Sequence, residues 1–160
     1  MKVATYERVS TIEQTTENQR PALQGWVQAH PDAVLVRPYR DVESGTKTTR
    51  PGFDRMLKDA RKGVFNVLVV WRLDRLGRST EHLLRTVREL EEAGVTLVSV
   101  RDGIDTKTAS GKAFLGMLAV FAQFERDILV ERTKAGMARA RAAGVHVGRP
   151  RKVQPFTASA

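Results

Sequence analysis

The sequence predicts an α/β fold with a mostly parallel central sheet of about four to five strands, flanked by helices. Three observations support this prediction. Segments with the composition of strands alternate with segments of helical pattern. Residues 67–71 form a continuous apolar run, which is typical of a strand covered on both faces. Residues 110–143 contain no proline and keep a helical pattern, so the chain is expected to end in a long helix.

Four segments have the composition of strands, at 2–9, 33–39, 67–71 and 95–100. The second of these alternates apolar and polar residues, which favours a strand with one exposed face. Helical segments separate the four strands, and a helix between two strands returns the chain to the same edge of the sheet. We therefore expect the strands to pair mostly in parallel.

Four helices are expected, over 21–30, 53–62, 80–93 and 110–143. Pro21 is tolerated only in the first turn of a helix, which fixes the start of the first one. Ser79 or Thr80 is expected to cap the third helix, and Gly94 to end it. The polar segment 41–52 has loop composition and is expected to be mobile.

The last predicted helix is unusual in its length and in its side chains. At 1.5 Å per residue it would be about 50 Å long, longer than a small domain is wide. Its first half is apolar around more of its surface than one sheet could cover, so we expect it to contact a second subunit as well. A helix folded back on its own sheet is the alternative. The residues expected at the interface between subunits are Phe114, Met117, Leu118, Phe121, Phe124 and Ile128.

The charge of the chain points to a polyanionic partner. The net charge is +9, and the 35 residues from Arg126 onward contain eight lysines and arginines but two acids. A charge gathered at one end favours nucleic acid, here double-stranded DNA. The absence of cysteine excludes a disulfide framework and thiolate metal sites. No apolar run suits a signal peptide or a membrane span, so we expect a cytoplasmic protein with no membrane partner.

A basic segment follows the long helix after Gly144. Residues 148–152, Gly-Arg-Pro-Arg-Lys, cannot continue a helix and suit the minor groove, where arginine reads groove width. A solvated tail is the alternative. We therefore expect a catalytic core over 1–109, a dimerisation and DNA-contacting helix over 110–143, and a basic arm over 144–160. The residues expected to contact DNA are Arg132, Arg139, Arg141, Arg149, Arg151 and Lys152.

A serine and several arginines follow two of the predicted strands. Ser10 ends the first strand, and Arg8 lies two residues earlier on the same side of it. Arg75 and Arg78 follow the apolar strand 67–71. The carboxyl ends of strands in an α/β sheet open onto a common crevice. Because arginine binds phosphate through two parallel hydrogen bonds, this combination favours serine attack on phosphorus.

Other interpretations of the same residues stay open. Residues 10–13, Ser-Thr-Ile-Glu, also match a helix capping box. Acidic side chains could hold Mg²⁺ in a metal-dependent nuclease, although the excess of arginine opposes metal binding. The candidate ligands are Asp41, Glu43, Asp74 and Asp102. A non-catalytic dimeric DNA-binding protein is a third possibility. No histidine stands where it is an obvious base, so the serine would be activated by the arginines or by Asp74 or Asp41.

Two motifs contain these residues, at 6–11, Tyr-Glu-Arg-Val-Ser-Thr, and at 73–79, Leu-Asp-Arg-Leu-Gly-Arg-Ser. They resemble the opening motif and the second motif of the serine recombinases, specifically the catalytic domain of the small resolvase and invertase group. Further matches follow in the same order, and the resemblance covers residues 1–150. It implies that Ser10 is the nucleophile and forms a 5′-phosphoserine bond. It also implies phosphate ligands at Arg8, Arg75 and Arg78, with supporting groups at Tyr6, Gln19, Asp41, Arg50 and Asp74.

The same resemblance implies dimers that join into a tetramer, cut all four strands and rejoin them without a cofactor or a catalytic metal. The long helix would contribute to regulation and DNA contact through Glu131 and Arg132. Two departures stand out. Glu7 occupies a position where the family usually has alanine. The family also carries a helix-turn-helix domain after the arm, whereas only ten residues follow Pro150, so we expect that domain to be absent.

Overall fold

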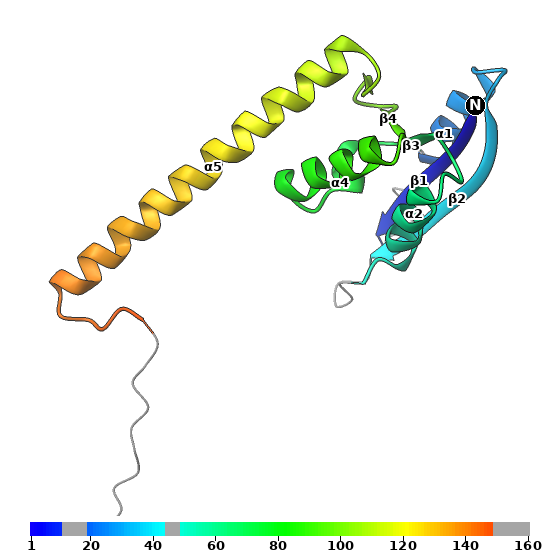
Figure 1. The fold of residues 1–160 in the computed structure, drawn as a ribbon. Coiled ribbons are helices and arrows are strands. Elements are labelled where there is room, and N and C mark those ends of the chain that lie inside the picture. Colours follow the sequence, from blue (N-terminus) through cyan, green and yellow to red (C-terminus); the bar gives the residue numbers. More distant parts are fainter. Residues whose placement is uncertain (11–18, 44–48, 149–160) are drawn as a thin grey trace, which may run out of the picture. The chain divides into compact units, whose positions relative to one another are not determined.

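The computed structural model describes residues 1–10, 19–43 and 49–148. Its contacts divide the chain into two units, Met1–Ala122 and Gln123–Ala160. The strands are β1 (Lys2–Ser10), β2 (Val34–Glu43), β3 (Val67–Val70), β4 (Thr96–Ser99) and β5 (Ile104–Asp105). The helices are α1 (Gln19–Gln28), α2 (Pro51–Arg61), α3 (Leu73–Leu76), α4 (Thr80–Glu92) and α5 (Ala109–Ala142). Figure 1 shows these elements along the chain.

The predicted fold class is confirmed by a five-stranded sheet in the order β2-β1-β3-β4-β5. β1 pairs in parallel with β2 and β3, and β3 pairs in parallel with β4. The short β5 is antiparallel to β4. It consists of two residues, too few to show a periodicity in the sequence. This order puts the ends of β1 and β3 side by side, which is what the candidate site requires.

The second strand is longer than predicted. β2 continues past Tyr39 to Glu43, so Asp41 lies in a strand and not in a loop. The reason is pairing, because the register with β1 continues as far as the pair formed by Ser10 and Glu43. The first residues of β2 do not alternate in burial either. Residues 34–36 are all exposed, because β2 is the edge strand of the sheet.

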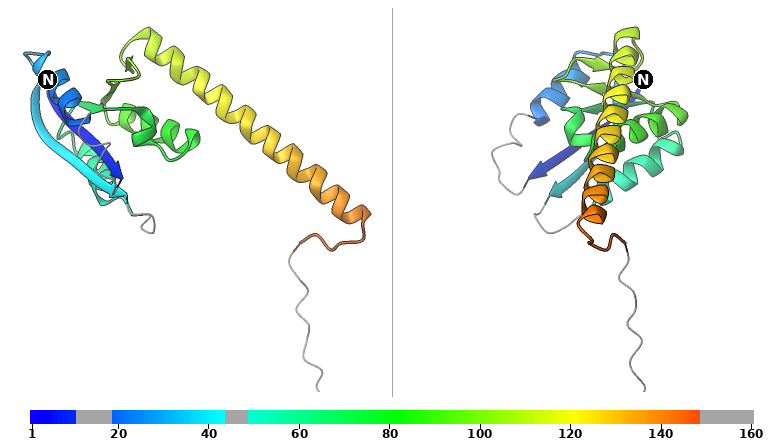
Figure 2. Two further views of the ribbon diagram at one scale, coloured as in Figure 1. Left: turned by 180° about the vertical axis from the view of Figure 1, so that it is seen from behind. Right: turned by 90° about the vertical axis from the view of Figure 1, so that its left-hand side faces the viewer.

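Each face of the sheet buries an apolar cluster. On one face, residues of α2 and α4 pack against alternate strand residues such as Tyr6 and Leu68. On the other face, Leu23 of α1 packs against Val3 and Val69. Figure 2 shows α1 and α4 on opposite sides of the strands. The apolar run of β3 is buried throughout, as its composition predicted.

The start of α5 packs so closely on β5 that it requires glycine. A Cβ atom at Gly111 would lie 1.9 Å from the carbonyl oxygen of Asp105, whereas one at Gly25 in α1 would have no neighbour within 4 Å. We expect Gly111→Ala to lower the free energy of unfolding by about 1–3 kcal/mol. Gly25→Ala should instead raise it by about 0.5–1 kcal/mol. Urea unfolding of both variants tests this, and equal unfolding midpoints would contradict it.

The helix α5 begins and ends within one residue of the predicted bounds. Gly144 follows it with a φ of 73°, the left-handed conformation that commonly ends a helix. In the described part of the chain, no helix combines the length and the apolar character needed to cross a membrane.

Candidate active site

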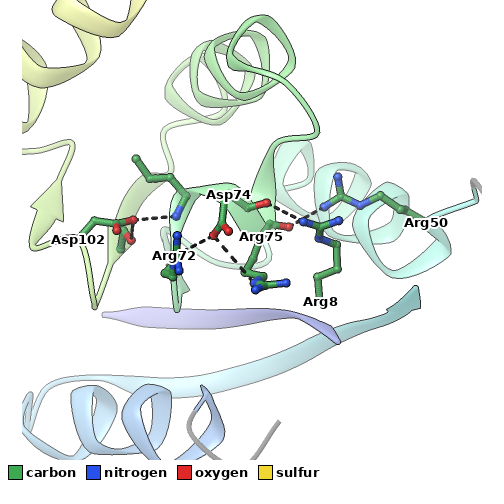
Figure 3. Close-up of polar contacts among 8 residues, drawn as sticks. Arg8, Arg50, Arg72, Asp74, Arg75 and Asp102 are labelled. Atoms are coloured by element: carbon green, nitrogen blue, oxygen red, sulfur yellow. Dashed lines mark hydrogen bonds and ion pairs between the residues drawn. The ribbon is translucent and has the colours of Figure 1, made fainter. Parts of the chain in front are cut away.

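The two sequence motifs meet at the carboxyl ends of β1 and β3. Arg8 comes from β1, and α3 follows β3 directly with Asp74 and Arg75. Nη2 of Arg8 donates a hydrogen bond of 2.8 Å to the backbone carbonyl of Asp74, as Figure 3 shows. Ser10 ends β1 two residues after Arg8. The Ser10 side chain lies outside what the structure describes, and so do Arg149, Arg151 and Lys152.

The residues after β3 form a short helix, α3, which brings Asp74 close to two arginines. In α3, Oδ1 of Asp74 lies 3.9 Å from Nε of Arg75 and 3.1 Å from Nε of Arg72. Arg72 is a residue that the sequence analysis missed, although it directly precedes the second motif. One half-exposed carboxylate therefore lies between two guanidinium groups of the site.

Asp102 anchors the start of α3. Its Oδ2 accepts hydrogen bonds from the amide of Leu73, at 2.8 Å, and from the hydroxyl of Ser99, at 2.7 Å. We had considered Asp102 only as a possible metal ligand. Its position after β4 was the available signal, because the carboxyl ends of neighbouring strands share one edge of the sheet. Through these bonds Asp102 ties the turn that carries Asp74 and Arg75 to the end of β4.

We had expected Arg50 to be part of a mobile loop, and it is not. It precedes α2 and is 8% exposed. Its guanidinium donates to the hydroxyl of Tyr6 from Nε at 3.1 Å and from Nη2 at 2.7 Å. It also donates to the carbonyls of Leu76, at 2.8 Å, and Arg75, at 3.1 Å, and lies 4.0 Å from the centre of the Phe53 ring. Arg50 therefore joins β1, α2 and α3 through a buried cation.

Tyr6 and Asp41 continue this buried network. The Tyr6 hydroxyl donates to Oδ2 of Asp41 at 2.9 Å. Asp41 also accepts from the amides of Gly52, at 2.8 Å, and Phe53, at 2.9 Å, so both carboxylate oxygens stabilise the start of α2. Burial raises the pKa of Tyr6 well above its ordinary value. The phenol consequently stays protonated and keeps its donor toward Asp41.

A cavity of about 370 Å³ lies beside α3. Its lining includes the charged residues Arg72, Arg78 and Asp102 and the apolar residues Leu83 and Phe114. Of the three arginines that we expected to bind phosphate, Arg78 lines this cavity.

Gln19, the remaining predicted supporting residue of the core, is the first residue of α1 and is fully buried. In the part of the chain that the structure describes, no group of three or more His, Asp or Glu side chains is arranged to hold a metal ion.

The structure places His82, which we had not considered an obvious base, beside Phe53. It lies in the first turn of α4, where Ser79 accepts the His82 amide hydrogen and so caps the helix as predicted. Its imidazole packs against Phe53 with ring centres 5.4 Å apart. Burial, followed by the charges of Arg50 and Arg85, lowers the pKa of His82. The imidazole is therefore kept neutral at the border of the arginine cluster, by which we mean Arg8, Arg50, Arg72 and Arg75 (Figure 3).

The predicted interface residues of α5 differ in burial. Phe114 and Leu118 pack against the core of the first unit. Ile128 is half-buried, whereas Met117, Phe121 and Phe124 are about 60% exposed, at 57%, 63% and 59%. Among the predicted DNA contacts, Arg132, Arg139 and Arg141 are exposed in the second unit. Their roles stay predictions.

Comparison with known proteins identifies the family. The family model described as "Resolvase, N terminal domain" matches residues 3–146. The chain belongs to the resolvase family of serine recombinases. The serine recombinase gin of Escherichia phage Mu is 45% identical over 148 residues, which cover 92% of this chain and 72% of gin. The DNA-invertase hin of Salmonella typhimurium is 45% identical over 92% of this chain and 73% of its own length.

A solved structure supports the same assignment. A resolvase family site-specific recombinase from Streptococcus pneumoniae has a TM-score of 0.74 and 29% identity, covering 88% of this chain and 99% of the other. The family predicted from the two motifs is therefore confirmed. This recombinase is an enzyme that breaks and rejoins DNA strands in site-specific recombination.

Proposed function

We propose that this recombinase cleaves DNA by attack of the Ser10 hydroxyl on a backbone phosphodiester. The new bond joins Oγ of Ser10 to phosphorus as the bond from phosphorus to the 3′ oxygen breaks. The serine hydroxyl gives up one proton and the 3′ oxygen takes one up, so the step is balanced. The products are a 5′-phosphoserine link and a free 3′-hydroxyl. Attack by a 3′-hydroxyl on the phosphoserine reverses these steps and rejoins the DNA, so the bond energy is kept and no nucleotide cofactor is needed.

The hydrogen bond between Arg8 and the Asp74 carbonyl is the observation that carries this proposal. It joins the strand that ends at Ser10 to the turn that carries Arg75. We assign Arg8, Arg75 and Arg78 to the phosphate, because phosphoryl transfer needs fixed positive charge on the equatorial oxygens. Tyr6, Asp41 and Arg50 would hold α3 in place, and Gln19 and Asp74 would act as further supporting groups.

We further propose that the enzyme acts on double-stranded DNA as a homodimer that assembles into a tetramer. The exposed apolar residues of α5 support this assignment, because an isolated helix does not leave such side chains in water without a partner. In this proposal residues 1–109 are the catalytic core, 110–143 form the dimerisation helix and 144–160 are the basic arm. The DNA contacts would be Arg132, Arg139, Arg141, Arg149, Arg151 and Lys152, and the reaction would take place in the cytoplasm.

A covalent-adduct assay tests the proposed chemistry. The protein is incubated in EDTA with a library of supercoiled plasmids, quenched with detergent and digested for mass spectrometry. We expect DNA linked through its 5′ end to the peptide that contains Ser10. Cleavage that appears only after Mg²⁺ is added, without an adduct, would favour the metal-dependent nuclease. DNA binding without cleavage under either condition would favour the non-catalytic DNA-binding protein.

A further inference from the structure

We propose that the ion pair between Glu7 and Arg20 positions the strand that carries Arg8 and Ser10 for cleavage. This role rests on the proposed function of Ser10. Glu7 lies in β1 directly before Arg8, and Arg20 is the second residue of α1. Nε of Arg20 lies 3.2 Å from Oε2 of Glu7.

The pair is placed on the side of β1 that faces away from the arginine cluster. Alternate residues of a strand point to opposite faces, so Glu7 shares the face of Val3, which packs with α1. Arg8 points to the face of Tyr6, and its hydrogen bond to the Asp74 carbonyl of α3 lies on that face. The strand is thus bound on both faces near its end, by Arg8 to α3 and by Glu7 to α1.

The two residues lie close to both ends of the connection that follows β1. Glu7 is three residues before Ser10, and Arg20 comes directly after the buried Gln19. The ion pair therefore fixes the start of α1 relative to the end of β1. Because a phosphoryl transfer depends on in-line geometry, a small displacement of this strand end would slow attack without removing any reacting group.

The surroundings of the pair argue for a positional role over a purely stabilising one. Glu7 is 7% exposed, and the pair lines a cavity of about 230 Å³ with the apolar side chains of Leu23, Val27 and Leu35. An apolar residue would cost less at such a site, because a buried carboxylate must be desolvated. What a charged pair adds is a directional bond between the strand and the helix.

The chain offers a matched control in a second pair between a strand and a helix. Nη1 of Arg37 in β2 lies 2.7 Å from Oδ2 of Asp59 in α2. Asp59 is largely buried, as Glu7 is. This pair binds the edge strand to its helix and, among the residues that the structure describes, its side chains make no bond to β1, although the backbone of Arg37 pairs with Ala4. Losing it should affect stability alone.

The test uses three changes to the ion pair: Glu7→Gln, Glu7→Val, and the double variant that combines Glu7→Arg with Arg20→Glu. Arg37→Gln is the control. Three quantities are measured for each: the rate of adduct formation at saturating DNA, the Kd for DNA, and the melting temperature. We expect both Glu7 variants to form the adduct about 10- to 100-fold more slowly, with an unchanged Kd. The double variant should recover most of the rate, since the adjoining cavity leaves room for the larger side chain. Arg37→Gln should lower the melting temperature and leave the rate unchanged.

Glu7→Val keeps the test decisive if Glu7→Gln fails to fold, because valine suits a buried strand and carries no charge to desolvate. A stable Glu7→Val protein that forms the adduct at the parent rate would overturn the inference. An equal loss of rate in Arg37→Gln would also overturn it, because any loosened helix would then suffice. A parent protein that forms no adduct at Ser10 would instead overturn the proposed function, and with it this role for the pair.

Discussion

Replacing Ser10 with alanine is expected to reduce the DNA–protein adduct below detection while leaving DNA binding and oligomerisation intact. The substitution removes one oxygen atom, and that oxygen is the proposed nucleophile. The arginine cluster and the exposed basic residues of α5 stay in place and still attract phosphate. The measurement is the detergent-resistant adduct in EDTA, together with a gel-shift titration and sedimentation of the same samples.

A second serine to alanine substitution is the matched control. Ser79 is the last residue of the second motif, and its hydroxyl accepts the amide hydrogen of His82 to cap α4. Ser79→Ala should cost about 0.5–2 kcal/mol of stability but should still form the adduct. If the adduct persists in Ser10→Ala and disappears in Ser79→Ala, the nucleophile is Ser79 and our proposal names the wrong serine. An adduct that persists in both would exclude either residue as the nucleophile.

The sequence predicted most of the fold because its main elements have strong local patterns. The apolar run of β3, the serine cap of α4 and the long helix α5 are each visible within a short window of residues. The misplaced features depend on contacts between distant residues. The extension of β2 to Glu43 follows from pairing with β1, and the two-residue β5 follows from pairing with β4. Such pairings leave no periodicity in the sequence.

The residues of the candidate site also divide into those that local motifs reveal and those that depend on distant contacts. The motif residues Arg8, Asp74 and Arg75 could be found from composition and spacing, and the structure brings them together. The partners of Arg50 could not be found in this way, because all four of its hydrogen bonds go to distant residues. Two reach the Tyr6 hydroxyl, 44 positions away, and the other two reach backbone carbonyls 25 and 26 positions away. We expected Arg50 to lie in a mobile loop, and its guanidinium is instead fully engaged within the protein. Its chemistry is that of a buried cation holding the site together.

Because Arg50 binds groups inside the protein, replacing it should affect both stability and cleavage. Arg50→Met keeps an unbranched side chain but leaves the Tyr6 hydroxyl and the carbonyls of Arg75 and Leu76 without their donor. Each unsatisfied buried group costs about 1–3 kcal/mol, so with three such groups we expect the free energy of unfolding to fall by at least about 3 kcal/mol. Because α3 then loses its tie to α2, adduct formation should slow by about 100-fold or more. Urea unfolding and the adduct rate, both measured where the variant is folded, check these values.

Arg50→Lys separates the charge of this residue from its geometry. Lysine keeps the positive charge between β1 and α3, but its ammonium cannot reproduce the planar fork that serves the Tyr6 hydroxyl and the carbonyls of Arg75 and Leu76 together. We therefore expect Arg50→Lys to recover part of the stability and little of the cleavage rate. Full recovery of the rate would mean that positive charge alone suffices at this position. The fixed geometry that Arg50 gives α3 would then not be needed for attack on the phosphate.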